Sequence, residues 1–367
     1  MKTKIIYLTL FLAGSFLWSC NKSATSTSPA EPTVSLKSAL TTGVQNLTTA
    51  VNEITASTGY QVVAGPADLT TKSLVLTPLD TVSHSILLAN IAGVYDYKAT
   101  VFKLGKLSFI TRFFNKTADN AQMIVRLPTS KVTNSRTLLQ YTPSDTLLAN
   151  DYVITLSDYD FTYRIFGGYD YRMASSTVIK GVAAGTYKIQ STHNKTANPH
   201  YSAEYDFPNG YITKITYAPG DTAVSDYSIS NGTKVLYEEQ FTSIRSSSAT
   251  PQRETNYSLT IGNVEIVRQL AKGKSTLDSA KVYVGGVLET KAKVSVVNNT
   301  TGTVDNTVTS QKRDLLITFD DGTTATISSL ANTAIPTIST LFTSLHQANF
   351  ATAIVDWIAW EVYYTKP

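Results

Sequence analysis

The hydrophobic pattern of the chain changes its period at about residue 60. Between residues 35 and 59 apolar side chains recur at steps of three and four, which is the spacing of one face of an α-helix. Ser35 is suited to cap the start of this helix, and Gly59 follows its end. The apolar face is aliphatic, so we expect it to pack on a sheet. Its residues are Leu36, Leu40, Val44, Leu47, Val51 and Ile54.

From about Tyr60 to Ile327 apolar and polar residues alternate, which is typical of strands with one buried face. Clear runs cover 152–156, 161–165, 186–190 and 211–217. Turn-forming sequences separate the runs, and in several of them Asn-Gly or Asp-Gly supplies the positive φ of a tight hairpin. We therefore expect roughly fifteen strands, joined mainly by short turns and hence antiparallel.

Two apolar segments near the carboxyl end predict helices. Apolar residues between 338 and 345 have helical spacing, and the stretch 350–360 is almost continuously apolar. The end of that stretch, Trp357 to Trp360, is equally suited to finish a helix or to begin a last strand. Asp356 and Glu361 make burial in lipid costly, so we expect the helix pair to cover the sheet.

The predicted fold class is therefore mainly β. We expect a large antiparallel sheet, built as a meander, a curved sheet or a sandwich, with an N-terminal helix and C-terminal helices packed on it. Helices beside a large curved sheet are also the plan of periplasmic lipid-carrier folds. By that analogy, a hydrophobic cavity between sheet and helices is a hypothesis.

Composition narrows the class of partner. Of 367 residues, 42% are hydrophobic and 16% are charged, which suits a folded core and argues against wholesale disorder. The net charge of +4 and the lack of a Lys/Arg cluster argue against a nucleic-acid partner. A single cysteine excludes an intrachain disulfide and a cysteine-based zinc site. Gly273-Lys274-Ser275 lacks the earlier glycine of a phosphate-binding loop, so we expect no nucleotide partner and no cofactor.

The first twenty residues have the organisation of an export signal. Basic residues precede an apolar run over 5–18, which is shorter than the roughly 20 residues that span a bilayer. The run ends in Leu17-Trp18-Ser19-Cys20, which resembles the lipobox of bacterial lipoproteins, although Trp18 replaces the usual small residue. The resemblance implies cleavage after Ser19, a diacylglyceryl thioether on Cys20, and acylation of the new amine, for example by palmitate. The alternative is a plain secretory signal in which Cys20 has no role.

These features suggest three segments: a signal peptide over 1–19, a flexible tether over 20–33, and a β-rich mature domain over 34–367. A Ser-rich stretch near 246–254 is either a boundary within that domain or a long hairpin loop. The expected location is the bacterial cell envelope, with the lipid anchored in a membrane. Asn21 and the absence of a following acidic cluster favour the periplasmic side of the outer membrane, with surface exposure as the alternative.

Aromatic residues crowd into one hairpin-like segment and form the main candidate site. Tyr159, Phe161 and Tyr163 share one face of a strand by the period of two, and Tyr169 and Tyr171 follow closely. Such a row of rings can be a carbohydrate platform or the wall of an apolar cavity. The alternative is a core face near the edge of a sheet.

Two weaker constellations concern metal binding and catalysis. His193 and His200 flank a loop and would face each other if that loop closes a hairpin, with Glu204 as the nearest third ligand. Asp158 and Asp160 share a strand face, and paired carboxylates can perform acid–base chemistry. The simpler interpretations are polar residues beside a turn and a solvated strand face, so we assign no metal and no catalytic residue.

A third pattern concerns modification of the protein. Asp-Ser/Thr followed by an apolar residue resembles the O-glycosylation acceptor of exported Bacteroidota proteins, and each match lies near a turn signal. The candidate acceptors are Thr81, Thr146, Thr222 and Ser279.

The texture of the chain as a whole resembles Bacteroidota-type lipoproteins, a resemblance that supplies no catalytic residues. The leading functional expectation is a non-enzymatic binding or carrier module for a glycan or an apolar ligand. One alternative is a glycosylated scaffold lipoprotein that binds other envelope proteins. The other is an envelope hydrolase using the aspartate or histidine pair.

Overall fold

The computed structural model describes residues 31–64, 83–98, 113–132, 148–194, 199–245, 253–270, 280–299, 312–346 and 350–365. The chain divides into two units, Met1–Ala30 and Glu31–Pro367, and the following description concerns the second unit.

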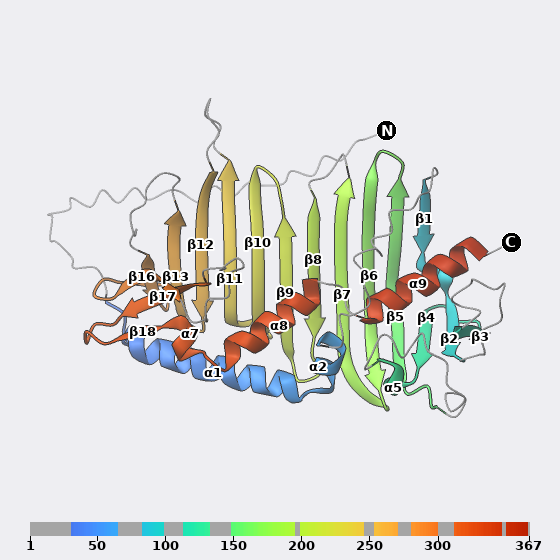
Figure 1. Cartoon of the computed structure of the whole chain (residues 1–367), viewed down its shortest axis with the longest axis horizontal. Coiled ribbons are helices and arrows are strands. Elements are labelled where there is room, and N and C mark those ends of the chain that lie inside the picture. Colours follow the sequence, from blue (N-terminus) through green and yellow to red (C-terminus); the bar gives the residue numbers. More distant parts are fainter. Residues whose placement is uncertain are drawn as a thin grey trace, which may run out of the picture. The chain divides into compact units, whose positions relative to one another are not determined.

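Fifteen of the described strands form one wide sheet (Figure 1). Most of it is a meander in which each strand pairs antiparallel with the next. The meander consists of β5 (Tyr152–Arg164), β6 (Gly168–Ile179), β7 (Val182–Asn194), β8 (His200–Asp206), β9 (Tyr211–Ala218), β10 (Thr222–Asn231), β11 (Lys234–Arg245), β12 (Arg253–Ile261), β13 (Val264–Leu270), β14 (Lys281–Val284) and β15 (Val287–Glu289). The predicted mainly β fold with a large antiparallel sheet is confirmed. β11 pairs directly with β12, so one sheet continues across residues 246–252, which lie outside the described residues.

Beyond β5 the sheet ends in four shorter strands. β4 (Met123–Leu127) pairs with the first half of β5, and β1 (His84–Leu87) pairs with the second half. β2 (Gly93–Tyr97) lies between β4 and β3 (Phe114–Ala118). The β2–β4 pair is parallel, so the sheet is mixed at this edge.

A second, antiparallel sheet follows the meander in the sequence. Its three strands are β16 (Lys293–Asn299), β17 (Lys312–Thr318) and β18 (Thr324–Thr326). The short helices are α3 (Leu88–Ile91), α5 (Thr129–Val132) and α7 (Ile327–Leu330).

One face of the main sheet is covered by helices (Figure 1). They are α1 (Leu36–Ala56), α2 (Thr58–Val63), α8 (Ala334–His346) and α9 (Phe350–Thr365). We call this side the helix face; it carries the buried alternate strand residues, such as Tyr159, Ile189 and Leu259. We call the opposite side the open face; it carries the polar alternate residues, such as Arg172 and Lys188. Successive residues of each strand point to these two faces in turn, which explains why apolar and polar residues alternate along the sequence.

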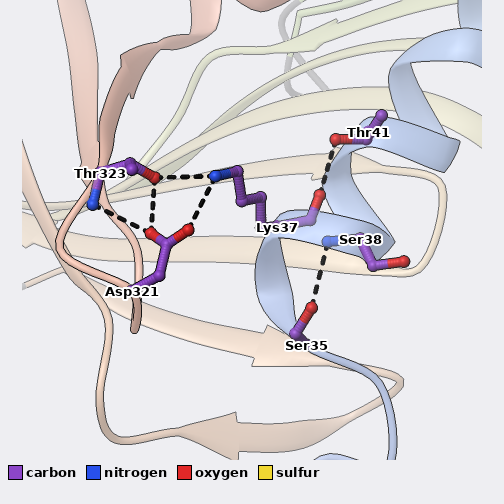
Figure 2. A network of polar contacts seen from close by, with 6 residues as sticks. All are labelled: Ser35, Lys37, Ser38, Thr41, Asp321 and Thr323. Atoms are coloured by element: carbon purple, nitrogen blue, oxygen red, sulfur yellow. Dashed lines mark hydrogen bonds and ion pairs between the residues drawn. The ribbon is translucent and has the colours of Figure 1, made fainter.

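The N-terminal helix forms as predicted, and all six residues of its apolar stripe are buried. Ser35 caps α1, because its Oγ accepts a hydrogen bond from the Ser38 backbone nitrogen at 3.3 Å (Figure 2). At Gly43 the helix backbone lies so close to β12 that an added Cβ would be 2.8 Å from the carbonyl oxygen of Ile261. Gly59 follows the end of α1, as expected, and lies within α2.

The first turn of α1 also contacts the second sheet. The Lys37 Nζ donates to Asp321 Oδ2 at 2.8 Å and to Thr323 Oγ1 at 3.0 Å (Figure 2). Both acceptors lie in the turn between β17 and β18. The hydrogen bond from Lys37 is the largest cause that lowers the pKa of Asp321 below its usual range. This ion pair links the start of the domain to a hairpin close to its end.

Both predicted C-terminal helices are present. α8 contains the expected apolar positions, and α9 continues to Thr365 without a break. Trp357 and Trp360 therefore belong to a helix, which resolves the alternative of a last strand in favour of the helix.

Candidate functional site

A bulge in β5 decides which way the predicted aromatic residues point. The register with β6 shifts between Leu156 and Asp158, so Ser157 is one extra residue in β5. An extra residue reverses the alternation of side chains, which places Tyr159 on the same face as Leu156. Phe161 and Tyr163 follow Tyr159 onto the helix face, and Tyr171 and Tyr169 lie opposite them on β6.

Helix α9 crosses the strands that carry these aromatic residues (Figure 1), and it contacts Tyr159 and Phe161. The indole of Trp360 is 5.5 Å from the ring of Phe161 and 5.0 Å from the imidazole of His84, between ring centroids. Tyr159 is only 2% exposed and Phe161 only 8% exposed. At this end of the sheet the rings form a core surface. This agrees with the alternative interpretation of the sequence, a core face near the edge of a sheet.

The contact between α9 and the sheet contains a carboxyl group. Oδ1 of Asp356 accepts hydrogen bonds from the hydroxyl groups of Tyr159 at 3.0 Å and of Tyr171 at 3.1 Å. Asp356 keeps part of its surface exposed, but burial of its carboxyl group raises its pKa to about 7. Burial, and then the charge of Asp356, raise the pKa values of both tyrosines well above 10. The sequence contains no local signal for this contact, because Asp356 and Tyr159 are 197 positions apart.

The predicted aromatic residues belong to a longer row that crosses the sheet. Directly paired residues on nine consecutive strands, from β5 to β13, lie on the helix face, and we call them the cross-strand row. In order they are Phe161, Tyr171, Ser191, Tyr201, Tyr217, Ser225, Phe241, Tyr257 and Arg268.

The two ends of the cross-strand row differ in what covers them. Tyr201 of the row contacts α8, because its hydroxyl donates to the carbonyl oxygen of Leu345 at 2.6 Å. Beyond it, Phe342 of α8 contacts the next row of the helix face, 5.4 Å from the ring of Tyr227. Tyr217 is 46% exposed and Phe241 is 39% exposed. We call the residues from Tyr217 to Arg268 in this row the open end.

A second bulge turns Phe241 toward the helix face. The register between β10 and β11 shifts at Ile229 and Ser230, so Phe241 lies opposite Ser225 rather than Val224. Val224 is on the open face, where an unbroken register would also have placed Phe241. The ring of Phe241 instead lies 4.8 Å from that of Tyr257, at an interplanar angle of 56°. The sequence pattern alone does not predict this pair, because its formation depends on the bulge.

Polar groups accompany the rings of the open end. Ser225 separates Tyr217 from Phe241 in the row. Glu239, two residues before Phe241 on the same face of β11, accepts a hydrogen bond from the Tyr237 hydroxyl at 3.0 Å. Burial, and then the charge of Glu239, raise the pKa of Tyr257. The open end and the neighbouring Glu239 therefore combine ring faces with hydroxyl and carboxylate groups on rigid strands, an arrangement suited to binding and orienting a ligand.

The histidine pair does not assemble. His200 is paired with Thr192, so it projects from the open face, whereas His193 pairs with Tyr169 on the helix face. The expectation that the two imidazoles face each other across the loop is therefore wrong. Within the described residues, no group of three His, Cys, Asp or Glu side chains could hold a metal ion.

The aspartate pair lies on the open face. Asp158 forms an ion pair with Arg172, whose Nη2 is 3.3 Å from Asp158 Oδ1. Asp160 Oδ1 accepts a hydrogen bond from the Thr162 hydroxyl at 3.0 Å. Both carboxylates are thus engaged with neighbours on the strand surface, as expected for a solvated strand face.

Most of the predicted modification sites lie outside the described residues: Cys20, Thr81, Thr146 and Ser279. Thr222 is described, and it is exposed at the first position of β10. A sugar on this hydroxyl would extend into solvent.

Neither the helices nor similarity to known proteins indicates a function for this site. No helix in the described ranges is long and apolar enough to cross a membrane. No protein-family model matches this chain, and no curated protein and no solved structure is significantly similar to it.

Proposed function

We propose that this protein is a non-enzymatic, lipid-anchored module of the bacterial envelope that binds a glycan through the open end of the cross-strand row. The observation that carries the proposal is the exposure of Tyr217 and Phe241 on the helix face. Large apolar side chains in the middle of a sheet are normally covered, so exposed rings there indicate a binding surface.

The chemistry of the open end favours a saccharide among the candidate ligands. A sugar ring has an apolar C–H face, which packs on aromatic rings, and a rim of hydroxyl groups, which needs hydrogen-bond partners. The tilted rings of Phe241 and Tyr257 offer an apolar surface for the C–H face. Ser225 and Glu239 offer hydrogen-bond partners for the hydroxyl groups. Five strands separated by about 4.8 Å give the open end a length of about 19 Å, which suits an oligosaccharide.

An apolar carrier is less well supported. The carrier hypothesis needs a cavity between the helices and the predicted aromatic residues. At that place Trp360 packs against Phe161, and the Asp356 carboxyl group binds two tyrosines. These contacts fill the space with the protein's own side chains.

The anchoring part of the proposal rests on the lipobox-like sequence over 17–20 and on the polar tether that follows it. Several acyl chains on one cysteine would hold the protein at a membrane, and the tether would let the domain reach a glycan nearby. Cys20→Ala should release the full chain from membranes into the soluble fraction. If the Cys20→Ala variant stayed in the membrane fraction and could be extracted only with detergent, lipidation of Cys20 would be contradicted. The periplasmic side of the outer membrane remains the proposed location.

Glycan binding is tested with the full chain in detergent on an array of neutral and acidic oligosaccharides, followed by calorimetry with the best probe. Phe241→Ala and Tyr217→Ala should each weaken binding by about tenfold, because truncating a central contact residue typically costs more than 1 kcal/mol. Phe166→Ala is the matched control, since Phe166 is 84% exposed in the β5–β6 turn, away from the row. Absence of binding to every probe, or equal losses in all three variants, would overturn the proposal.

A further inference from the structure

We infer that the glycan carries an anionic group, a carboxylate or a sulfate, which pairs with Arg268 at the β13 end of the cross-strand row. This inference rests on the proposed function and specifies its ligand class. It starts from the position of Arg268, directly opposite Tyr257 in the register of β12 and β13.

Arg268 lacks the partners that comparable arginines have. Its Nε is buried and has no hydrogen-bond partner among the described residues, and no carboxylate there forms an ion pair with it. On the open face, by contrast, Arg164 pairs with Asp170 and Arg172 pairs with Asp158. Partly buried charged groups are normally paired, and an unmade hydrogen bond to one is costly, so an anionic group on a ligand would complement Arg268.

The geometry of the row matches one ligand that touches both the rings and the cation. Directly opposed residues of neighbouring antiparallel strands have their Cβ atoms about 5 Å apart. A sugar packed on Phe241 and Tyr257 would therefore bring a substituent within reach of the Arg268 guanidinium group. The planar guanidinium can donate two parallel hydrogen bonds to a carboxylate or a sulfate, which a neutral hydroxyl cannot match.

The charges around the open end agree with this polarity. Among the described residues, two carboxylates raise the pKa of Tyr257, those of Glu239 and Asp314. Glu239, two strands from Arg268, accepts a hydrogen bond from Tyr237, and Asp314 accepts one from Ser328. Glu265 is on β13 itself but belongs to the open face, because it is an odd number of residues from Arg268. The cation at the β13 end is therefore available to an anionic ligand.

The test compares chemically matched saccharides on the full chain in detergent. Calorimetry with an oligogalacturonate, with its neutral methyl ester, and with sulfated and unsulfated dextran oligosaccharides measures the contribution of the anionic group. We expect an anionic probe to bind at least about tenfold more tightly than its neutral match. A preference for the carboxylate or for the sulfate identifies the source of the charge, and either supports the inference.

Variants assign the preference to Arg268. Arg268→Gln should remove the difference between charged and neutral probes and reduce the salt dependence of binding, while Arg268→Lys should retain part of it. Arg245→Gln is the control for losing one positive charge, since Arg245 is exposed at the end of β11. Circular dichroism and thermal melting show whether each variant is folded.

The outcomes separate this inference from the proposed function. Equal binding of charged and neutral probes, or an unchanged preference in folded Arg268→Gln, would overturn the anionic ligand and leave glycan binding intact. Failure of the wild-type protein to bind any saccharide would overturn both.

Discussion

Asp356 offers a direct test of how α9 is held on the sheet. Its carboxyl group accepts hydrogen bonds from Tyr159 and Tyr171, and burial raises its pKa from 3.8 to about 7. Between these two pKa values the folded protein holds a proton that the unfolded chain has released. The stability linked to Asp356 is therefore complete below pH 3.8 and is lost as the pH rises toward about 7.

The size of the loss follows from the shift in pKa. A rise from 3.8 to about 7 is roughly 3 pKa units, and each unit corresponds to about 1.4 kcal/mol, which gives about 4 kcal/mol. Because Asp356 keeps part of its surface exposed, solvent screening makes this an upper value. Asp356→Asn cannot ionise, but its amide oxygen can still accept from both tyrosines. The variant should resemble the wild type near pH 4 and exceed its stability by up to about 4 kcal/mol at pH 8.

Urea denaturation of both proteins between about pH 4 and pH 9 measures this effect, because groups that titrate equally in both cancel in the difference. Asp119→Asn is the control. The hydrogen bond from Lys116 lowers the pKa of the exposed Asp119, so the difference should have the opposite sign and be small. A wild-type minus Asp356→Asn difference that stays constant with pH would refute the reasoning.

Three further predictions concern the packing of α1, the register of β5 and a surface ion pair. Gly43→Ala should destabilise the protein by about 1–3 kcal/mol in urea denaturation, because its Cβ would lie 2.8 Å from a backbone oxygen of β12; a more stable variant would contradict this. Deleting Ser157 should still allow folding, because Leu156 and Asp158 would then pair consecutively with Ser175 and Ala174 and Tyr159 would stay on the helix face, and Ser157→Ala should cost less than about 0.5 kcal/mol; a deletion variant that fails to fold by circular dichroism would show that the bulge itself is required. A double-mutant cycle on Lys37 and Asp321 should give a coupling energy below about 1 kcal/mol, because their side chains are 47% and 46% exposed; a larger coupling would mean that the pair is shielded from solvent.

Elements that depend on near neighbours could be predicted from the sequence. α1 has its cap at Ser35 and an apolar stripe within one segment, and both signals are local. The β10–β11 hairpin is marked by Asn231-Gly232, and Gly232 has the positive φ of 56° that such a turn needs. In these cases the sequence contains both the pattern and its physical cause.

Register was harder to predict than the strands themselves. In β5 the sequence does carry a sign of the bulge, because buried residues are even-numbered up to Leu156 and odd-numbered from Tyr159. In the β10–β11 hairpin the turn alone predicts that Phe241 pairs with Val224. The bulge that prevents this is compatible with burial of Tyr237 against Phe342, a residue of α8 about a hundred positions away. Local patterns do not contain such information.

The sequence also did not predict which strands α9 covers. The helix is apolar enough to pack on any strand pair, and its contact with Tyr159 and Tyr171 depends on one carboxyl group and one indole. The aromatic cluster that is densest in the sequence is therefore the one that the protein covers with its own helix. The rings of the open end come from three separate strands and are gathered only by register.

The two ends of the cross-strand row separate the requirements of folding from those of binding. At the covered end Phe161 is 8% exposed and packs on Trp360, so Phe161→Ala should cost about 3–5 kcal/mol of stability. The packing of Tyr237 is compatible with the bulge before Phe241, but it does not require a phenyl ring at position 241. With 39% of its surface exposed, Phe241 buries much less than a core phenylalanine, and a small polar residue would serve the strand as well. Phe241→Ala should therefore lose glycan affinity while keeping most of the free energy of unfolding, the reverse of the pattern at Phe161.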